Sequence, residues 1–248
     1  MRKYCIFLFM AFLPVIAHSQ DFPILAKAAK VADLAQALVS GAKIDDRSNN
    51  GQTALMFAAG FNPDPSTVVF LIGKGAAVDA RTLDGWTPLI FAAEFGVSSD
   101  AVVILVHFGA AIGDKDSSSK TALHHAASVN KNPVVCTALL SSGASVSDVD
   151  SLGWTPLMRA ARNPNVQILE LLIQAGSDIN FKAKDGMTAL MAAALLSSDP
   201  RSLTILLSAG TDPKAEDNKG KNALEYAKFN VWINGTPEFW EMNDASFR

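Results

Sequence analysis

The sequence is poor in cysteine, in net charge and in long apolar segments, and each shortage excludes a class of protein. Only Cys5 and Cys136 occur among 248 residues, too few for a disulfide-rich scaffold or a cysteine-based zinc ribbon. A formal charge of −3 gives no basic field for nucleic acid, so we expect no nucleic-acid partner. With 49% hydrophobic and 18% charged residues, the chain is nevertheless too apolar to be disordered.

The sequence motifs of common catalytic sites are absent as well. There is no Gly-x-x-x-x-Gly-Lys-Ser/Thr phosphate loop, no His-Glu-x-x-His zinc motif, no Cys-x-x-Cys and no Gly-x-Ser-x-Gly nucleophile turn. We therefore predict a protein that is not an enzyme, with no catalytic residue, no metal site and no cofactor.

The N-terminal residues 1–19 have the pattern of a secretory signal peptide. Two basic residues precede an apolar run, and Ala17 and Ser19 occupy the small-residue positions before a cut that leaves Gln20 first. The alternative is a membrane anchor, but the run is shorter than the roughly 20 residues that cross a bilayer, and Pro14 interrupts it. We expect an exported bacterial chain, periplasmic or secreted, with no membrane insertion after cleavage. Cleavage removes two of the 21 basic residues, so the formal charge becomes −5 and Cys136 remains the only thiol.

Self-similar segments recur along the rest of the chain. The pattern Thr-Ala/Pro-Leu-x-x-Ala-Ala begins at five threonines spaced by 33 or 34 residues, and a variant begins at Asn222. A glycine follows each threonine 21 or 22 residues later, in the pairs Thr53 and Gly75, Thr87 and Gly109, Thr121 and Gly143, Thr155 and Gly176, and Thr188 and Gly210. Such a period indicates a repeat protein in which each unit stacks on its neighbours.

The chemistry of one unit predicts two helices. The threonine hydroxyl accepts a backbone N–H at the start of the first helix, and a proline such as Pro88 fits the first helical position. Leu55, Ala58 and Ala59 then share one apolar face. A second helix is predicted over 67–73, and Gly75 ends it in the left-handed conformation.

These residues resemble ankyrin repeats, a family with a period of 33 residues and the pattern Thr-Pro-Leu-His-x-Ala. The resemblance covers about residues 24–242 and implies an all-α ankyrin-repeat solenoid of helix-turn-helix units with β-turn fingers. Only His124 occupies the histidine position of the pattern. The predicted single domain, 20–248, divides into an N-terminal cap, five full units and a C-terminal cap, at 20–48, 49–82, 83–116, 117–150, 151–183, 184–217 and 218–248.

Both ends are predicted to be caps. Residues 25–41 are expected to form a reduced unit with a shortened second helix. At the other end, Trp232, Phe239 and Trp240 are expected to cover the apolar face of the last repeat. A solenoid requires such atypical ends because an internal repeat left at a terminus exposes its core.

The resemblance implies that function lies on the concave face, which the turn tips and the exposed side of the first helices form. Rigid aromatic side chains and arginine there are typical of binding hot spots. An equally open alternative is that the aromatic rings pack on neighbouring repeats and that Arg159 forms an ion pair with a nearby carboxylate. The candidate partner-binding residues are Phe57, Phe61, Trp86, Phe91, Phe95, Trp154 and Arg159.

We therefore expect a monomeric, non-enzymatic module that binds another protein in an exported compartment. Within this class, the chain is alternatively an inhibitor of a periplasmic enzyme or an immunity-type protector against a toxin. From other classes, the alternatives are a purely structural scaffold whose faces are polar, or an undetected enzyme accessory.

Overall fold

The computed structural model describes residues 21–96 and 98–247. These residues contain fourteen α-helices and no strand, in agreement with the expected all-α class. The predicted signal peptide lies outside the described residues. The helices are α1 (Asp21–Leu25), α2 (Val31–Val39), α3 (Ala54–Phe61), α4 (Ser66–Gly73), α5 (Pro88–Phe95), α6 (Asp100–His107), α7 (Ala122–Val129), α8 (Pro133–Ser141), α9 (Pro156–Ala160), α10 (Val166–Gln174), α11 (Ala189–Leu196), α12 (Arg201–Ser208), α13 (Ala223–Ala227) and α14 (Pro237–Phe247).

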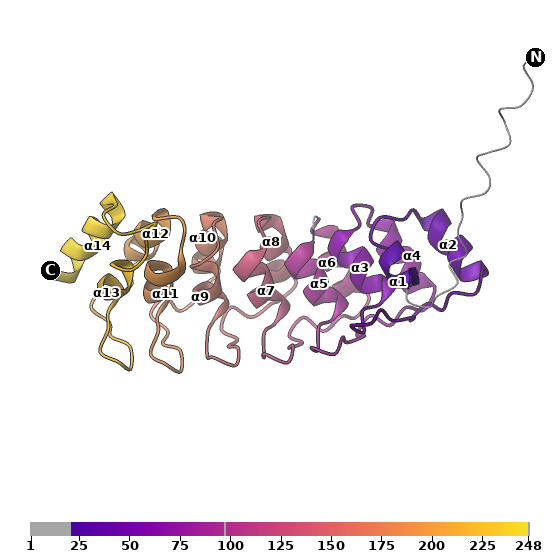
Figure 1. Ribbon diagram of the computed structural model, residues 1–248, viewed down its shortest axis with the longest axis horizontal. Helices are drawn as coiled ribbons and strands as arrows, with labels where there is room; N and C mark the ends of the chain where they lie inside the picture. Colours follow the sequence, from indigo (N-terminus) through magenta and orange to yellow (C-terminus); the bar gives the residue numbers. More distant parts are fainter. Residues whose placement is uncertain (1–20, 97, 248) are drawn as a thin grey trace, which may run out of the picture.

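The helices stand in two rows along an elongated array, and hairpin-shaped loops project from one side (Figure 1). Each odd-numbered helix packs against the next odd-numbered helix, and each even-numbered helix against the next even-numbered one. We call the odd-numbered row the inner row and the loops that precede its helices the fingers. Because every unit contacts only its neighbours, the core is a seam that runs the length of the array.

The predicted capping chemistry fixes where the inner helices begin. The hydroxyl of Thr87 accepts the backbone N–H of Ile90 at 3.3 Å, and Pro88 occupies the first helical position. Thr53, Thr155 and Thr188 accept the corresponding N–H groups at 3.3–3.5 Å. After each outer helix the glycine adopts positive φ, as Gly75 does at 91°. Local sequence chemistry therefore sets both ends of the helical unit.

A buried asparagine joins four of the units to the unit before. The side-chain amide of Asn163, for example, donates to the carbonyl oxygens of Ala127 and Asn130, both at 3.0 Å. Asn62, Asn130 and Asn230 each make the corresponding pair of bonds to the unit before. These amides satisfy carbonyl groups at the ends of inner helices that would otherwise be buried without a partner.

Neighbouring fingers are also hydrogen-bonded to each other through the backbone. The N–H of Ser151 donates to the carbonyl of Ser118 at 2.9 Å, and the N–H of Asn218 donates to that of Asp185 at 3.0 Å. The fingers therefore form a continuous edge along the array, and this edge fixes the spacing of the side chains at their bases.

The two ends differ in part from the predicted caps. The second helix of the N-terminal unit, α2, has nine residues and is not shortened; the five-residue α1 is the shorter one. At the C-terminal end Phe239 is buried as predicted, together with Met242. Trp232, in the turn before α14, and Trp240, on α14, are instead exposed.

Among the described residues, no helix combines the length and the apolar character needed to cross a membrane.

Candidate interaction surface

Five aromatic side chains meet on the inner row near the N-terminal end of the array. Within α3 and α5 the rings are four residues apart, a spacing that places them on one face. The stacking of units then brings Phe61 to 4.9 Å from Phe95, and Trp86 stacks on Phe95 at 5.9 Å from the other side. We call this group the aromatic cluster: Phe57, Phe61, Trp86, Phe91 and Phe95.

The cluster is layered, with one ring beneath the others. Phe91 is only 3% exposed and packs against Trp86 and Phe57, so it supports the surface from below. Phe95 is 38% exposed, and Phe57, Phe61 and Trp86 are half-buried. Phe91 was predicted to be a contact residue, but its burial leaves it without access to a partner.

A cation lies beside the cluster at one end and a histidine at the other. The ammonium group of Lys27 sits 4.5 Å from the centre of the Phe61 ring. The ring of His125 contacts Trp86 edge-to-face at 4.6 Å. The contacts of the aromatic cluster thus extend from the N-terminal unit to α7.

Trp154 and Arg159, also offered as contact residues, are buried at 7% and 8% exposure. The Nε of Arg159 donates to the Oδ2 of Asp150 at 2.8 Å, and its guanidinium lies 4.8 Å from the Trp154 ring. This is the ion-pair alternative considered for Arg159. Arg159, held by Asp150, covers the Trp154 ring, so neither Arg159 nor Trp154 is accessible to a partner.

The Asp150–Arg159 pair belongs to a repeated arrangement, which we call the finger latch. In each latch an aspartate of the finger uses Oδ1 to accept two backbone N–H groups of its own turn, and Oδ2 to bind the side chain nine residues later on the inner helix. Its three examples are Asp116 with His125, Asp150 with Arg159, and Asp217 with Tyr226.

Two of the latches, those of Asp150 and Asp217, hold the pKa of the carboxyl group below its usual value. Burial by itself would raise the pKa of Asp150, but hydrogen bonds from Arg159 and from the Trp154 N–H hold the pKa below its usual value. The Tyr226 hydroxyl likewise lowers the pKa of Asp217, and that bond raises the pKa of Tyr226 to about 12. The sequence contains a signal for these pairs. Where the finger has an aspartate at this position, a polar side chain follows nine residues later, and the unit that has Ala183 in place of the aspartate has an alanine there instead.

Comparison with known proteins identifies the family. A model described as "Ankyrin repeats (3 copies)" matches residues 24–116, 93–183 and 157–231, which is most of the chain. The chain belongs to the ankyrin repeat family. Ankyrin repeats are protein-interaction modules and typically have no catalytic activity.

This ankyrin repeat protein is similar to a solved structure and, over a short segment, to a second protein. The solved structure of the human ASB11 ankyrin repeat domain superimposes on this protein with a TM-score of 0.76. The match covers 89% of this chain and 96% of the ASB11 chain. At 21% sequence identity, this likeness shows the fold. A 62-residue segment is 44% identical to the mitochondrial disaggregase of Bos taurus. That segment is 25% of this chain and 9% of the disaggregase, so the chain spans less than a tenth of that relative's length.

His124, at the histidine position of the ankyrin pattern, has a structural role. Its Nδ1 accepts the backbone N–H of Thr121 at 3.2 Å, so the ring proton is on Nε2, which donates to the carbonyl of Trp154 at 3.0 Å. Burial lowers the pKa of His124 to about 4. The neutral ring therefore ties the start of α7 to the next unit of the ankyrin stack.

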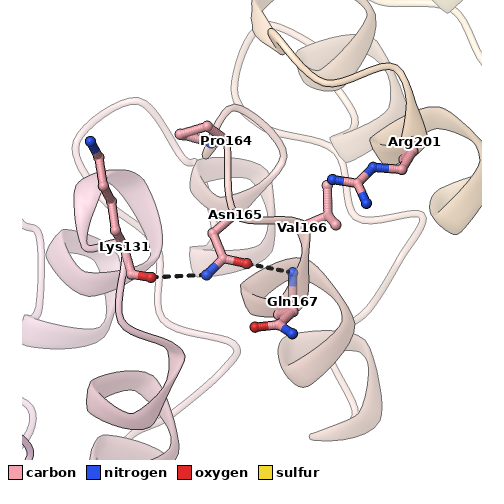
Figure 2. A pocket seen from close by; sticks show the side chains of 6 residues that line it. All are labelled: Lys131, Pro164, Asn165, Val166, Gln167 and Arg201. Atoms are coloured by element: carbon pink, nitrogen blue, oxygen red, sulfur yellow. Dashed lines mark hydrogen bonds between the residues drawn. The ribbon is translucent and has the colours of Figure 1, made fainter.

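A hollow in the ankyrin array lies where α10 begins (Figure 2). Its volume is about 510 Å³, and Asn165 crosses it, donating to the carbonyl of Lys131 at 2.9 Å and accepting from the Gln167 N–H at 3.1 Å. These contacts cap α10 and link two units. The lining residues do not include a nucleophilic side chain next to a general base. The lining residues are Lys131, Pro164, Asn165, Val166, Gln167 and Arg201.

The cysteine of the described chain is not placed for nucleophilic chemistry. Cys136 is buried, and burial raises the pKa of its thiol to about 12, which disfavours the reactive thiolate. Within residues 21–96 and 98–247, no group of three or more histidine, cysteine, aspartate or glutamate side chains is placed to hold a metal ion.

Proposed function

We propose that this ankyrin repeat protein is a non-enzymatic module that binds a protein partner on the concave, finger-lined face of its array. The aromatic cluster is the observation that carries the proposal. Large rings stacked in a rigid frame, and accessible on one side, are typical of hot spots in protein interfaces. A purely structural scaffold is expected to present polar faces instead, and Phe95 at 38% exposure is out of place on such a face.

The binding site is tested by replacing the accessible ring and its neighbour with alanine, as Phe95→Ala alone and combined with Trp86→Ala. The matched control is Leu196→Ala, because Leu196 occupies the place of Phe95 three units along the array and is 42% exposed. Partners captured from an extract of the exported compartment are identified and purified, and their Kd is then measured by calorimetry. Only variants that keep the melting temperature of the wild type are compared.

We expect Phe95→Ala to weaken binding by at least about tenfold, since a hot-spot truncation costs roughly 2 kcal/mol or more. Leu196→Ala is expected to leave the Kd unchanged. Equal affinities for wild type and the double variant would reject the aromatic cluster as the binding site. If the purified partner is an enzyme or a toxin, its activity with and without this protein tests the inhibitory or protective role.

We also propose that the chain acts after export, as a monomer. The support is the signal-like pattern of residues 1–19. Cell fractionation followed by N-terminal sequencing should recover a mature chain that begins at Gln20, and light scattering should give the mass of one copy. Recovery of an intact N-terminus from the cytoplasmic fraction would exclude the exported role.

A further inference from the structure

We infer that protonation of His125 regulates the aromatic cluster, so that partner binding by this surface weakens as the pH rises. The inference rests on the proposed function for the site of binding, but the protonation of His125 and its effect on the fold are measurable without a partner. The structure places His125 between two carboxylates.

The two ring nitrogens of His125 both face carboxylate oxygens. Nδ1 lies 2.6 Å from the Oε2 of Glu94, and Nε2 lies 2.9 Å from the Oδ2 of Asp116. An ionised carboxylate only accepts hydrogen bonds, and a neutral imidazole has one N–H and one lone pair. Two such bonds therefore require the imidazolium form, in which both nitrogens donate.

This bridge is shielded from water and joins two units of the array. The side chains of His125 and Asp116 are each 4% exposed, and that of Glu94 is 19% exposed. Glu94 comes from α5, Asp116 from the following finger, and His125 from α7. A proton on one ring thus holds neighbouring units together, in an environment where screening by salt is weak.

The neighbouring polar groups around this bridge have partners of their own. On α9, which packs against α7, Arg159 is bound to Asp150. In the finger, the backbone N–H of Lys120 donates to the second oxygen of Asp116. The neighbouring His124 is bound to Thr121 and to the next unit, so it does not share these carboxylates.

Trp86 connects the bridge to the binding surface. Its ring contacts His125 edge-to-face at 4.6 Å and stacks on Phe95 at 5.9 Å. When His125 loses its proton, one ring nitrogen presents a lone pair to a carboxylate oxygen at hydrogen-bond distance. That repulsion displaces the imidazole or the carboxylate, and Trp86 loses the ring that supports it.

The array itself suggests the control variants. Glu94→Gln preserves the shape of the bridge but lets a neutral imidazole satisfy both neighbours, because it donates to Asp116 and accepts from the new amide. His125→Arg places a permanent cation where the next unit has Arg159. Glu94→Gln keeps His125 but lets the ring satisfy both neighbours without a second proton, and His125→Arg removes the histidine, so in neither variant does the bridge depend on a proton between about pH 5 and 8, the range in which histidine ordinarily titrates.

The first measurement uses the isolated protein. Nitrogen-15 NMR of the imidazole at pH 6 is expected to show both nitrogens of His125 protonated. From pH 6 to 8.5 the melting temperature of the wild type should fall relative to those of both variants, since His107 and His124 are common to all three chains. A single protonated nitrogen at pH 6, or parallel melting curves for wild type and Glu94→Gln, would overturn the inference.

The second measurement is the Kd of the purified partner over the same pH range. We expect the wild type to lose affinity by on the order of tenfold, a typical coupling between two sites, and both variants to lose less. If the Kd of the wild type changes with pH as little as the Kd values of the variants do, regulation by His125 is rejected, and the proposed binding site is unaffected. If instead the Phe95→Ala and Trp86→Ala changes have no effect on binding, the proposed site fails, while the NMR and melting results still decide the state of His125.

Discussion

Two adjacent histidines of α7 illustrate how the position of a side chain in a repeat array sets its chemistry. His124 points along the array toward the backbone of the next unit, where burial favours the neutral ring. His125 points toward the preceding unit and meets Glu94 and Asp116. The first histidine therefore disfavours a proton in the folded state, whereas both ring nitrogens of the second face proton acceptors.

Replacement of His124 by methionine should make the protein less sensitive to acid. Methionine is the residue at the same place in three sister units, at Met56, Met158 and Met191. The pKa of His124 is about 4 in the fold and 6.5 in the reference state, so the unfolded chain binds more protons between these values. Stability attributable to this ring is present above about pH 6.5 and is lost as the pH falls toward about 4, by roughly 2–3 kcal/mol.

Urea unfolding at pH 7 and pH 4.5 measures this difference. The carboxylates, including Asp150 and Asp217 with their lowered pKa values, are common to wild type and variant and cancel in the comparison. A variant that loses as much free energy of unfolding as the wild type between the two pH values would contradict the assignment of a neutral His124.

At the scale of helices and fingers, the local chemistry was readable from the sequence, whereas contacts between units were not. Threonine caps and the glycines after the outer helices marked the ends of helices closely, and α4 (Ser66–Gly73) begins one residue before the predicted 67–73. The finger latches escaped prediction because they join residues nine apart on different elements. The exposure of each aromatic ring likewise depends on the neighbouring unit, so Phe91 and Trp154 became buried where access was expected.

The contact between fingers predicts that two glycines with similar backbone angles differ in their tolerance of alanine. Gly176 has φ +86° and no atom within 4 Å of an added Cβ, whereas Gly186 has φ +82° and an added Cβ would lie 2.6 Å from the N of Asn218. Gly176→Ala should cost only the left-handed strain, about 1–2 kcal/mol. Gly186→Ala should cost about 1–3 kcal/mol more, because the finger must also move away from its neighbour.

Thermal and urea unfolding of the two glycine variants provide the comparison. The Asn218 N–H, which donates to the Asp185 carbonyl at 3.0 Å, should also exchange faster with solvent in Gly186→Ala. Equal losses of stability in the two variants would show that the spacing of fingers has no energetic weight.

For the whole molecule, contacts only between neighbours mean that stability is a sum of local terms and depends on the two ends. The predicted solenoid and its period are confirmed by the family match and the array of helices. The accessible candidates Phe57, Phe61, Trp86 and Phe95 stay predictions, because their test is binding. The period could be predicted because helix caps and the spacing of apolar residues lie within each unit, where one sequence is enough to show them. The accessible surface is what remains after all the units have packed, and a single unit does not display it.

The C-terminal end gives the last prediction. Phe239 is 5% exposed on α14, which packs against α12, while its neighbour Trp240 is 57% exposed. Phe239→Ala should lower the free energy of unfolding by about 3–5 kcal/mol, the usual cost of removing a buried phenylalanine. Trp240→Ala should cost about 1 kcal/mol, for the loss of its edge-to-face contact with Phe239.

Hydrogen exchange locates the damage in these end variants. Because each repeat contacts only its neighbours, Phe239→Ala should release protection first in α12 and α13 and leave α3 and α5 as protected as in the wild type. The exposed core of the last unit should also promote association, visible as a rise in mass by light scattering. A uniform loss of protection from α3 to α13 would mean instead that the array unfolds as one cooperative unit, so that the C-terminal helix stabilises the aromatic cluster at the opposite end.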